Sequence, residues 1–115
     1  MSGPLTGIRV LELGSFIAGP FAGQLLGDYG AEVIKIEPPK VGDPMRKWGH
    51  CDPNGHSYWW PAIARNKHSV AINLRSDEGK EIGRRLALQR HVVLENFPPG
   101  RLSEWQLGYS DLAKE

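Results

Sequence analysis

The chain has 115 residues, enough for one hydrophobic core but too few for two catalytic domains. Its 40% hydrophobic and 23% charged residues exclude intrinsic disorder and fibrous repeats. The formal net charge of +1 gives no overall field toward nucleic acid or an anionic membrane, so we expect neither as a partner. No apolar run approaches the roughly 20 residues of a membrane helix.

The first third of the chain predicts a βαβ unit. Residues 8–13 alternate apolar and charged side chains, which indicates a half-buried strand. Residues 19–30 begin with Gly-Pro and carry apolar residues at helical spacing, which indicates a helix. Residues 31–37 are typical of a second strand, and the following Pro-Pro pair ends it because proline has no backbone donor.

The middle of the chain has less regular patterns. Residues 38–55 are rich in proline and glycine without an apolar period, which predicts a long ordered loop of the kind that often carries function. Residues 57–64 are aromatic and apolar and are compatible with a short helix under this loop. For Tyr58, Trp59 and Trp60, packing in the core is favoured over stacking on a purine ring.

The βα alternation resumes in the last third. Residues 69–74 alternate as a strand, and Ser76 opens a helix whose buried stripe is expected to be Ile82, Leu86 and Ala87. A further strand over 91–95, a turn at 98–100 and a short helix over 102–107 follow, and residues 111–115 resemble the start of another helix.

Four strands alternating with helices predict an α/β, Rossmann-like fold with a mostly parallel sheet and flanking helices. Because the last strand leaves a sheet edge unpaired, we expect the chain to be the incomplete N-terminal part of a larger domain. Ligands of such sheets bind beyond the carboxyl ends of the strands. The candidate loops are therefore 14–20, the segment after Glu37, 73–76 and 96–100.

Positive charge is concentrated between the second and third predicted strands. This concentration indicates either an anion site or a solvated basic face, and the charges alone do not decide between them. The basic residues are Lys40, Arg46, Lys47, Arg65, Lys67 and Arg75, with His50, His56 and His68, against only Asp43 and Asp52.

Other motifs give weaker indications. The spacing of Gly14, Gly19 and Gly23 differs from G-x-G-x-x-G, so a dinucleotide site using Glu37 is a minor alternative. The single Cys51, although near histidines, lacks the partners of a structural zinc site or a disulfide, so we expect no metal and a reducing, cytoplasmic location. No pair of acids stands out as a catalytic couple.

Taken together, collinear segments of the chain resemble the family III coenzyme A (CoA) transferases of the CaiB/BaiF type. Relatives in that family include formyl-CoA transferase, carnitine CoA-transferase and α-methylacyl-CoA racemase. The segments include the strings Ala-Gly-Pro, Lys-Ile-Glu and Glu-Asn-Phe. They are Leu5–Leu13, Ile17–Ala22, Leu26–Pro39, Gly42–Gly49, Asn66–Leu74, Glu78–Glu81, Val93–Gly100 and Leu107–Leu112.

The resemblance implies that residues 1–115 are the CoA-nucleotide-binding, N-terminal portion of a larger Rossmann-like domain, in a polypeptide that forms an interlocked homodimer. It implies backbone contacts to CoA from the residues after the first and third strands and a further wall after the fourth. Arg101 is expected to replace a basic residue that some members place at Glu104. The implied residues are Ile17, Ala18, Ile72, Asn73, Leu74, Arg75, Asn96, Phe97, Pro98 and Arg101.

The implied activity is transfer of CoA from an acyl-CoA thioester to a carboxylic acid through an aspartyl-CoA intermediate. In the family the catalytic aspartate lies beyond the matched region, so no residue of this chain is assigned a catalytic role. Three alternatives remain open: an acyl-CoA racemase of the same family, a stand-alone CoA-binding module without catalysis, and a dinucleotide oxidoreductase fragment.

Overall fold

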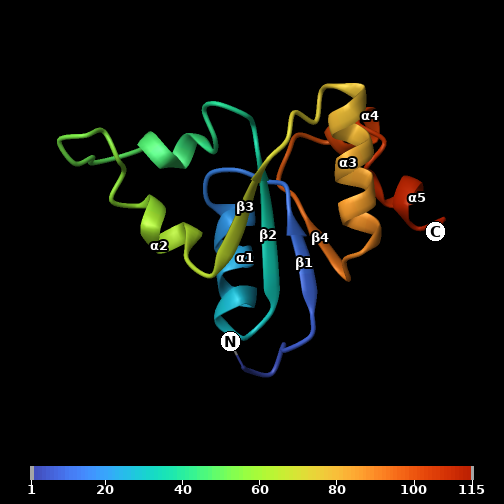
Figure 1. The fold of residues 1–115 in the computed structure, drawn as a ribbon, viewed down its shortest axis with the longest axis horizontal. Coiled ribbons are helices and arrows are strands. Elements are labelled where there is room, and N and C mark those ends of the chain that lie inside the picture. The colour runs from blue at the N-terminus through green and yellow to red at the C-terminus, as the bar shows by residue number, and fades with distance from the viewer. Residues whose placement is uncertain (1, 115) are drawn as a thin grey trace.

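The computed structural model describes residues 2–114 and contains a wholly parallel sheet, shown in Figure 1. Within those residues the sheet has four strands in the order β3-β2-β1-β4. This order, with the chain running outward from a central strand and then crossing to its other side, is that of a doubly wound α/β sheet. The expected Rossmann-like fold is confirmed. The strands are β1 (Arg9–Glu12), β2 (Glu32–Glu37), β3 (Lys67–Ala71) and β4 (Val92–Leu94).

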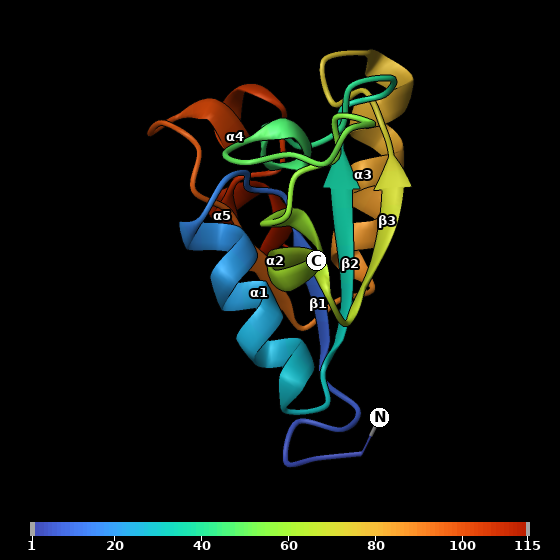
Figure 2. The same ribbon diagram turned by 90° about the vertical axis from the view of Figure 1, so that its left-hand side faces the viewer.

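Helices cover both faces of the sheet. Figure 2 shows α1 and α2 on one side of the strands and α3 on the other, as right-handed crossovers require. No helix among residues 2–114 is long and apolar enough to cross a membrane. The helices are α1 (Ala18–Asp28), the 3-10 helix η1 (Pro44–Lys47), α2 (Trp60–Ala64), α3 (Asp77–Leu88), α4 (Arg101–Glu104) and α5 (Tyr109–Leu112).

Apolar residues of the central strands alternate between two cores. On the α1 side, Val10, Ala31 and Val33 form a small cluster. The larger cluster lies on the α3 side, where the last helices also pack. Its buried members are Leu11, Leu13, Ile36, Ile72, Leu74, Ala87 and Leu107.

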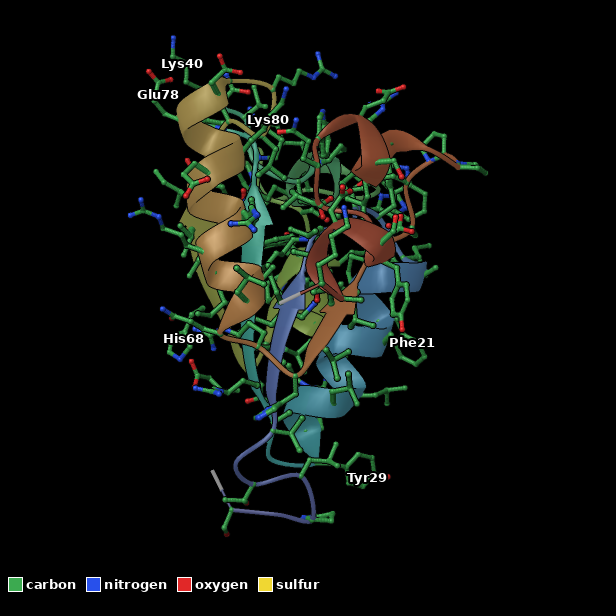
Figure 3. The ribbon with its side chains drawn as sticks, turned by 90° about the vertical axis from the view of Figure 1, so that its right-hand side faces the viewer. Phe21, Tyr29, Lys40, His68, Glu78 and Lys80 are labelled. Carbon is green, nitrogen blue, oxygen red and sulfur yellow. The ribbon has the colours of Figure 1, made fainter. Side chains whose placement is uncertain are left out.

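Helix α1 faces the sheet with its small residues. Gly19, Gly23 and Gly27 are buried, whereas Phe21 and Leu25 are exposed. Figure 3 shows Phe21 pointing away from the sheet. Because glycine has no side chain, the helix comes close to Glu12 of β1 at Gly23, to Asn96 at Gly19 and to Asn66 at Gly27. This geometry leaves room beneath the helix for the charged side chains of β1 and β2 described below.

The expected bounds of one strand and the expected burial of two sets of side chains are wrong. The third strand was expected over 69–74, but β3 spans Lys67–Ala71, because the apolar alternation continues into a loop that still faces the core. Ile82 is 50% exposed, since α3 packs through Gly79, Gly83 and Ala87 instead. Tyr58 and Trp59 are also exposed, because the segment 44–60 extends away from the sheet (Figure 1).

Candidate functional site

A cleft of about 660 Å³ lies at the carboxyl ends of the strands. All four candidate loops contribute to it, which confirms that they converge. Parallel strands with alternating crossovers bring these loops together. The lining residues are Leu13, Gly14 and Ser15 after β1; Lys35, Ile36, Glu37, Pro38, Pro39, Lys40, Asp43 and Pro44 around β2; Ile72, Asn73, Leu74 and Arg75 after β3; and Phe97, Arg101 and Trp105 after β4.

The residues implied by the family resemblance divide into two groups. Six of them line the cleft directly: Ile72, Asn73, Leu74, Arg75, Phe97 and Arg101. The other four, Ile17, Ala18, Asn96 and Pro98, lie in the bordering loops without lining it. Ile17 and Ala18 form the start of α1, and the side chain of Ile17 is exposed.

Asn96 connects two of the loops that border the cleft. Its Oδ1 accepts a hydrogen bond from the Ser15 amide at 2.9 Å, and its Nδ2 donates to the Ser15 carbonyl, also at 2.9 Å. A Cβ atom on Gly14 would collide with the Asn96 side chain, so a larger residue there would displace Asn96. Asn96 therefore shapes the wall formed by the loop after β1.

A second wall is aromatic. The rings of Phe97 and Trp105 meet edge to face with centroids 5.2 Å apart, and the Arg101 guanidinium lies 5.7 Å from the Trp105 ring centroid. Sequence reasoning missed Trp105, which lies beyond the strand-end loops. Its position one helical turn after Arg101 was the available signal.

The structure divides the basic residues into paired and available ones. Arg46, Arg65 and Lys67 form ion pairs with acidic side chains. Lys40 and Arg75 are exposed, line the cleft and have no ion pair among residues 2–114. Figure 3 shows Lys40 at the end of the molecule toward which the strands point. Arg101 also lines the cleft, but it is paired with Glu104 of its own helix at 3.5 Å, so the anion-site interpretation is supported chiefly by Lys40 and Arg75.

Beneath the cleft lies a cluster of buried charges that the sequence did not reveal. The Lys35 side chain is 2% exposed, and its Nζ lies 2.8 Å from each of three oxygens, those of Glu12 Oε2, Asp43 Oδ2 and the Gly14 carbonyl. The contacts to Glu12 and to the Gly14 carbonyl are hydrogen bonds, and the contact to Asp43 Oδ2 is an ion pair without hydrogen-bond geometry. Lys67 completes the cluster, pairing with Glu12 at 2.7 Å and donating to the Pro20 carbonyl. Burial lowers the pKa of the Lys67 amine.

Glu37, at the end of β2, holds the loop that follows. Its carboxylate accepts two hydrogen bonds from Arg46, at 2.8 and 2.7 Å, and others from Ser69 and the Asp43 amide. Burial raises the pKa of this carboxyl, but the donated hydrogen bonds outweigh it and lower the pKa to about 2. Because Arg46 binds both oxygens of the Glu37 carboxylate, Glu37 is not free to bind a ribose. The alternative of a dinucleotide site therefore loses the acidic residue that would bind the ribose.

The histidines and the cysteine of the described residues are not gathered into a metal site. Cys51 is exposed, and its sulfur contacts only backbone carbonyls. Within residues 2–114, no group of three or more histidine, cysteine, aspartate or glutamate side chains could hold a metal ion.

Comparisons with known proteins agree with this geometry. The family model described as CoA-transferase family III matches residues 5–115. Succinyl-CoA–D-citramalate CoA-transferase of Chloroflexus aurantiacus is 58% identical over 95% of this chain and 27% of its own length. Succinyl-CoA:glutarate CoA-transferase of Mus musculus is 47% identical over 96% of this chain and 26% of its own length.

A solved structure shows the same fold. The crystal structure of a CaiB/BaiF family protein from Brucella suis superimposes with a TM-score of 0.89 at 41% identity. The match covers 99% of this chain and 31% of that one. The chain thus spans between a quarter and a third of the proteins that it matches.

Proposed function

Because the chain belongs to CoA-transferase family III, we propose that its strand-end cleft binds the nucleotide part of CoA. The observation that carries the proposal is the arrangement of the cleft. Lys40, Arg75 and Arg101 surround a hollow with one aromatic wall, and all four strands end there. Phosphate groups take charge-assisted hydrogen bonds from arginine and lysine, and an adenine ring packs on aromatic side chains. CoA supplies both chemical groups.

Arg75 is the strongest candidate for a phosphate contact. It is exposed, and its backbone amide is held by Asn73 Oδ1 at 3.1 Å, which fixes where the side chain begins. The guanidinium is permanently charged and can bond two phosphate oxygens at once. The neighbouring backbone of Ile72, Asn73 and Leu74 then forms the floor of the proposed site, and Phe97 its side.

The whole protein is proposed to transfer CoA between an acyl-CoA thioester and a carboxylic acid. In this mechanism an aspartate outside residues 1–115 attacks the thioester carbonyl, which releases CoA thiolate and forms a mixed anhydride. The thiolate then attacks the aspartyl carbonyl, forming the aspartyl-CoA thioester and releasing the donor acid. The acceptor carboxylate attacks this thioester, which releases CoA thiolate and forms a second mixed anhydride. The thiolate then attacks the acyl carbonyl of the acceptor, which forms the product acyl-CoA and regenerates the aspartate carboxylate. This chain's contribution is to hold the nucleotide, whose binding energy aligns the distant thioester.

The names of the relatives suggest the donor. Those of Chloroflexus aurantiacus and Mus musculus described above are named for transfer from succinyl-CoA. We therefore propose succinyl-CoA as the acyl donor and a dicarboxylic acid as the acceptor. Exchange of CoA between succinyl-CoA and added acids would establish a transferase, whereas loss of α-proton label without an acceptor would indicate the racemase branch.

Substitution of Arg75 tests the proposed site. In the full-length protein, Arg75→Ala should weaken CoA binding by about tenfold or more, the value expected for losing a charged hydrogen-bond pair. The affinity is measured by titration calorimetry. Arg85→Ala is the matched control, because Arg85 lies on the outer surface of α3, where it pairs with Glu81 at 3.0 Å. Equal affinity of the wild type and the Arg75 variant would remove Arg75 from the site.

A further inference from the structure

The backbone of the loop after β1 is strained beside the cleft. Phe16 has a φ of 63°, in the left-handed region that residues other than glycine rarely adopt. Such a conformation persists only where the surrounding structure holds it, and it is concentrated at ligand-binding segments. Ser15, which lines the cleft, immediately precedes it, and Ile17 immediately follows.

Side chains from two other loops hold this segment. The Phe16 amide donates to Asp43 Oδ1 at 3.2 Å, and Asn96 binds both the amide and the carbonyl of Ser15. The Gly14 carbonyl accepts from Lys35 at 2.8 Å. Thus the polar backbone groups from the Gly14 carbonyl to the Phe16 amide are held by groups outside the segment.

Asp43 has the central place in this arrangement. It is buried, and its Oδ1 accepts from the Met45 amide at 2.9 Å as well as from Phe16. Its Oδ2 pairs with Lys35 at 2.8 Å. Asp43 is therefore the residue that joins the loop after β2 to the strained turn after β1, two adjacent walls of the cleft.

We propose that Asp43 is a positioning residue for CoA, which fixes the Gly14–Phe16 wall of the cleft by holding the Phe16 amide. The proposal rests on CoA binding in that cleft. Asp43 borders the cleft but is only 2% exposed, and both of its carboxylate oxygens face protein groups, so it acts through the wall that it holds. A wall already in its bound conformation loses less freedom on binding, so its contribution is to affinity and not to the chemical step.

The test compares variants of the full-length protein by CoA titration and by steady-state kinetics with succinyl-CoA. Asp43→Ala should raise the Kd for CoA about tenfold and raise KM, leaving kcat within about twofold. Adding Phe16→Gly should recover at least threefold of the lost affinity, because glycine adopts a positive φ without strain. Asp28→Ala is the matched control, since Asp28 binds Arg65 and Asn66 at the far end of α1.

A second variant separates holding the amide from burying a charge. Asp43→Asn keeps an oxygen for the Phe16 amide and leaves the Lys35 hydrogen bond to the Gly14 carbonyl in place, while it removes the charge of Asp43. Its Kd should remain within about threefold of the wild type. A Kd as high as that of Asp43→Ala would overturn the proposal, as would an unchanged Kd in Asp43→Ala.

Failure of the proposed CoA binding can be distinguished from failure of the proposed role of Asp43. If the wild type does not bind CoA, the cleft is not a CoA site, and amide hydrogen exchange then judges the role of Asp43. Exchange at Phe16 should be slow in the wild type and at least tenfold faster in Asp43→Ala. Equal exchange in the two proteins would show that Asp43 does not hold the turn.

Discussion

The two ends of the same sheet are both hollow, but they are built differently. At the carboxyl ends lies the cleft of about 660 Å³, and at the amino ends a second hollow of about 530 Å³. Figure 3 shows Lys40 toward the first end, and His68 and Tyr29 toward the second. The second hollow is lined by Thr6, Gly7, Ile8, Arg9, Gly27, Gly30, Ala31, Glu32, Val33, Asn66, Lys67 and His68.

The difference between the ends lies in how their charges are used. At the amino ends, Arg90 pairs with the half-exposed Glu32, and Arg65 pairs with Asp28 near the surface. At the carboxyl ends, Lys35 and Asp43 are buried and hold the backbone of neighbouring loops, and Lys67, which begins β3 at the other end, reaches Glu12 of the same cluster. Burying charges requires that all of them be paired, so such a cluster has structural consequences that a surface pair lacks. A hollow alone therefore identifies a site less well than the buried charges that shape its walls.

The largest expected effect comes from breaking the buried cluster. Lys35→Met leaves Glu12 and Asp43 with Lys67 as their single buried cation, and should lower the stability by about 3–5 kcal/mol. Thermal unfolding of the full-length protein measures the loss. Adding Asp43→Asn to Lys35→Met removes one of the two negative charges, and this double variant should recover much of the lost stability. If Lys35→Met unfolds at the wild-type temperature, the carboxyl-end charges are no more important than surface pairs.

Alanine substitutions at two glycines of α1 compare the two ends of the sheet within one helix. A Cβ on Gly23 would collide with the ion-paired Glu12 Oε1, whereas a Cβ on Gly27 would lie 3.1 Å from the Asn66 carbonyl oxygen. Alanine favours a helix by about 1 kcal/mol over glycine. Gly27→Ala should therefore be close to neutral, but Gly23→Ala should destabilise by about 1–3 kcal/mol through overpacking. Equal melting temperatures for the two variants would contradict the proposed difference between the ends.

The sequence predicted the architecture and the location of the cleft, because hydrophobic periodicity and parallel topology determine both. It did not predict how side chains share the faces of the sheet. The alternation over residues 8–13 predicted a half-buried strand, yet Glu12 and its register partner Lys35 of β2 lie buried side by side. Their opposite charges at paired positions were the available signal.

Hydrophobic periodicity also did not predict which faces of the helices are buried. Ile82 was expected in the core because it is apolar, but α3 buries Gly79 against the Asn73 carbonyl and Gly83 against Leu74 instead. A hydrophobicity pattern gives glycine little weight, although glycine permits the closest approach of a helix to a sheet. For the same reason the exposed Phe21 of α1 was not anticipated. The role of Asp43 depends on a turn conformation at Phe16 that nothing in the sequence specifies.

The smallest expected effect concerns pH and compares the two ends of β2. The hydrogen bonds to Glu37 lower its pKa from 4.5 to about 2, so its stabilising contribution is complete above pH 4.5 and is lost as the pH falls toward 2. Arg46 is 39% exposed and water screens the pair, so we expect a contribution of the order of 1 kcal/mol. Glu37→Gln should melt earlier than the wild type at pH 7, and the difference should shrink below pH 4.5.

Glu32 provides the control for this prediction, because it begins the strand that Glu37 ends. A hydrogen bond from Arg90 also lowers the pKa of the Glu32 carboxyl, but that side chain is half exposed and anchors no loop. Glu32→Gln should therefore change the melting temperature less than Glu37→Gln at pH 7. If the two variants lose stability equally and with the same pH dependence, the Glu37–Arg46 pair is only a surface ion pair. The carboxyl end would then owe its stability to the Lys35 cluster alone.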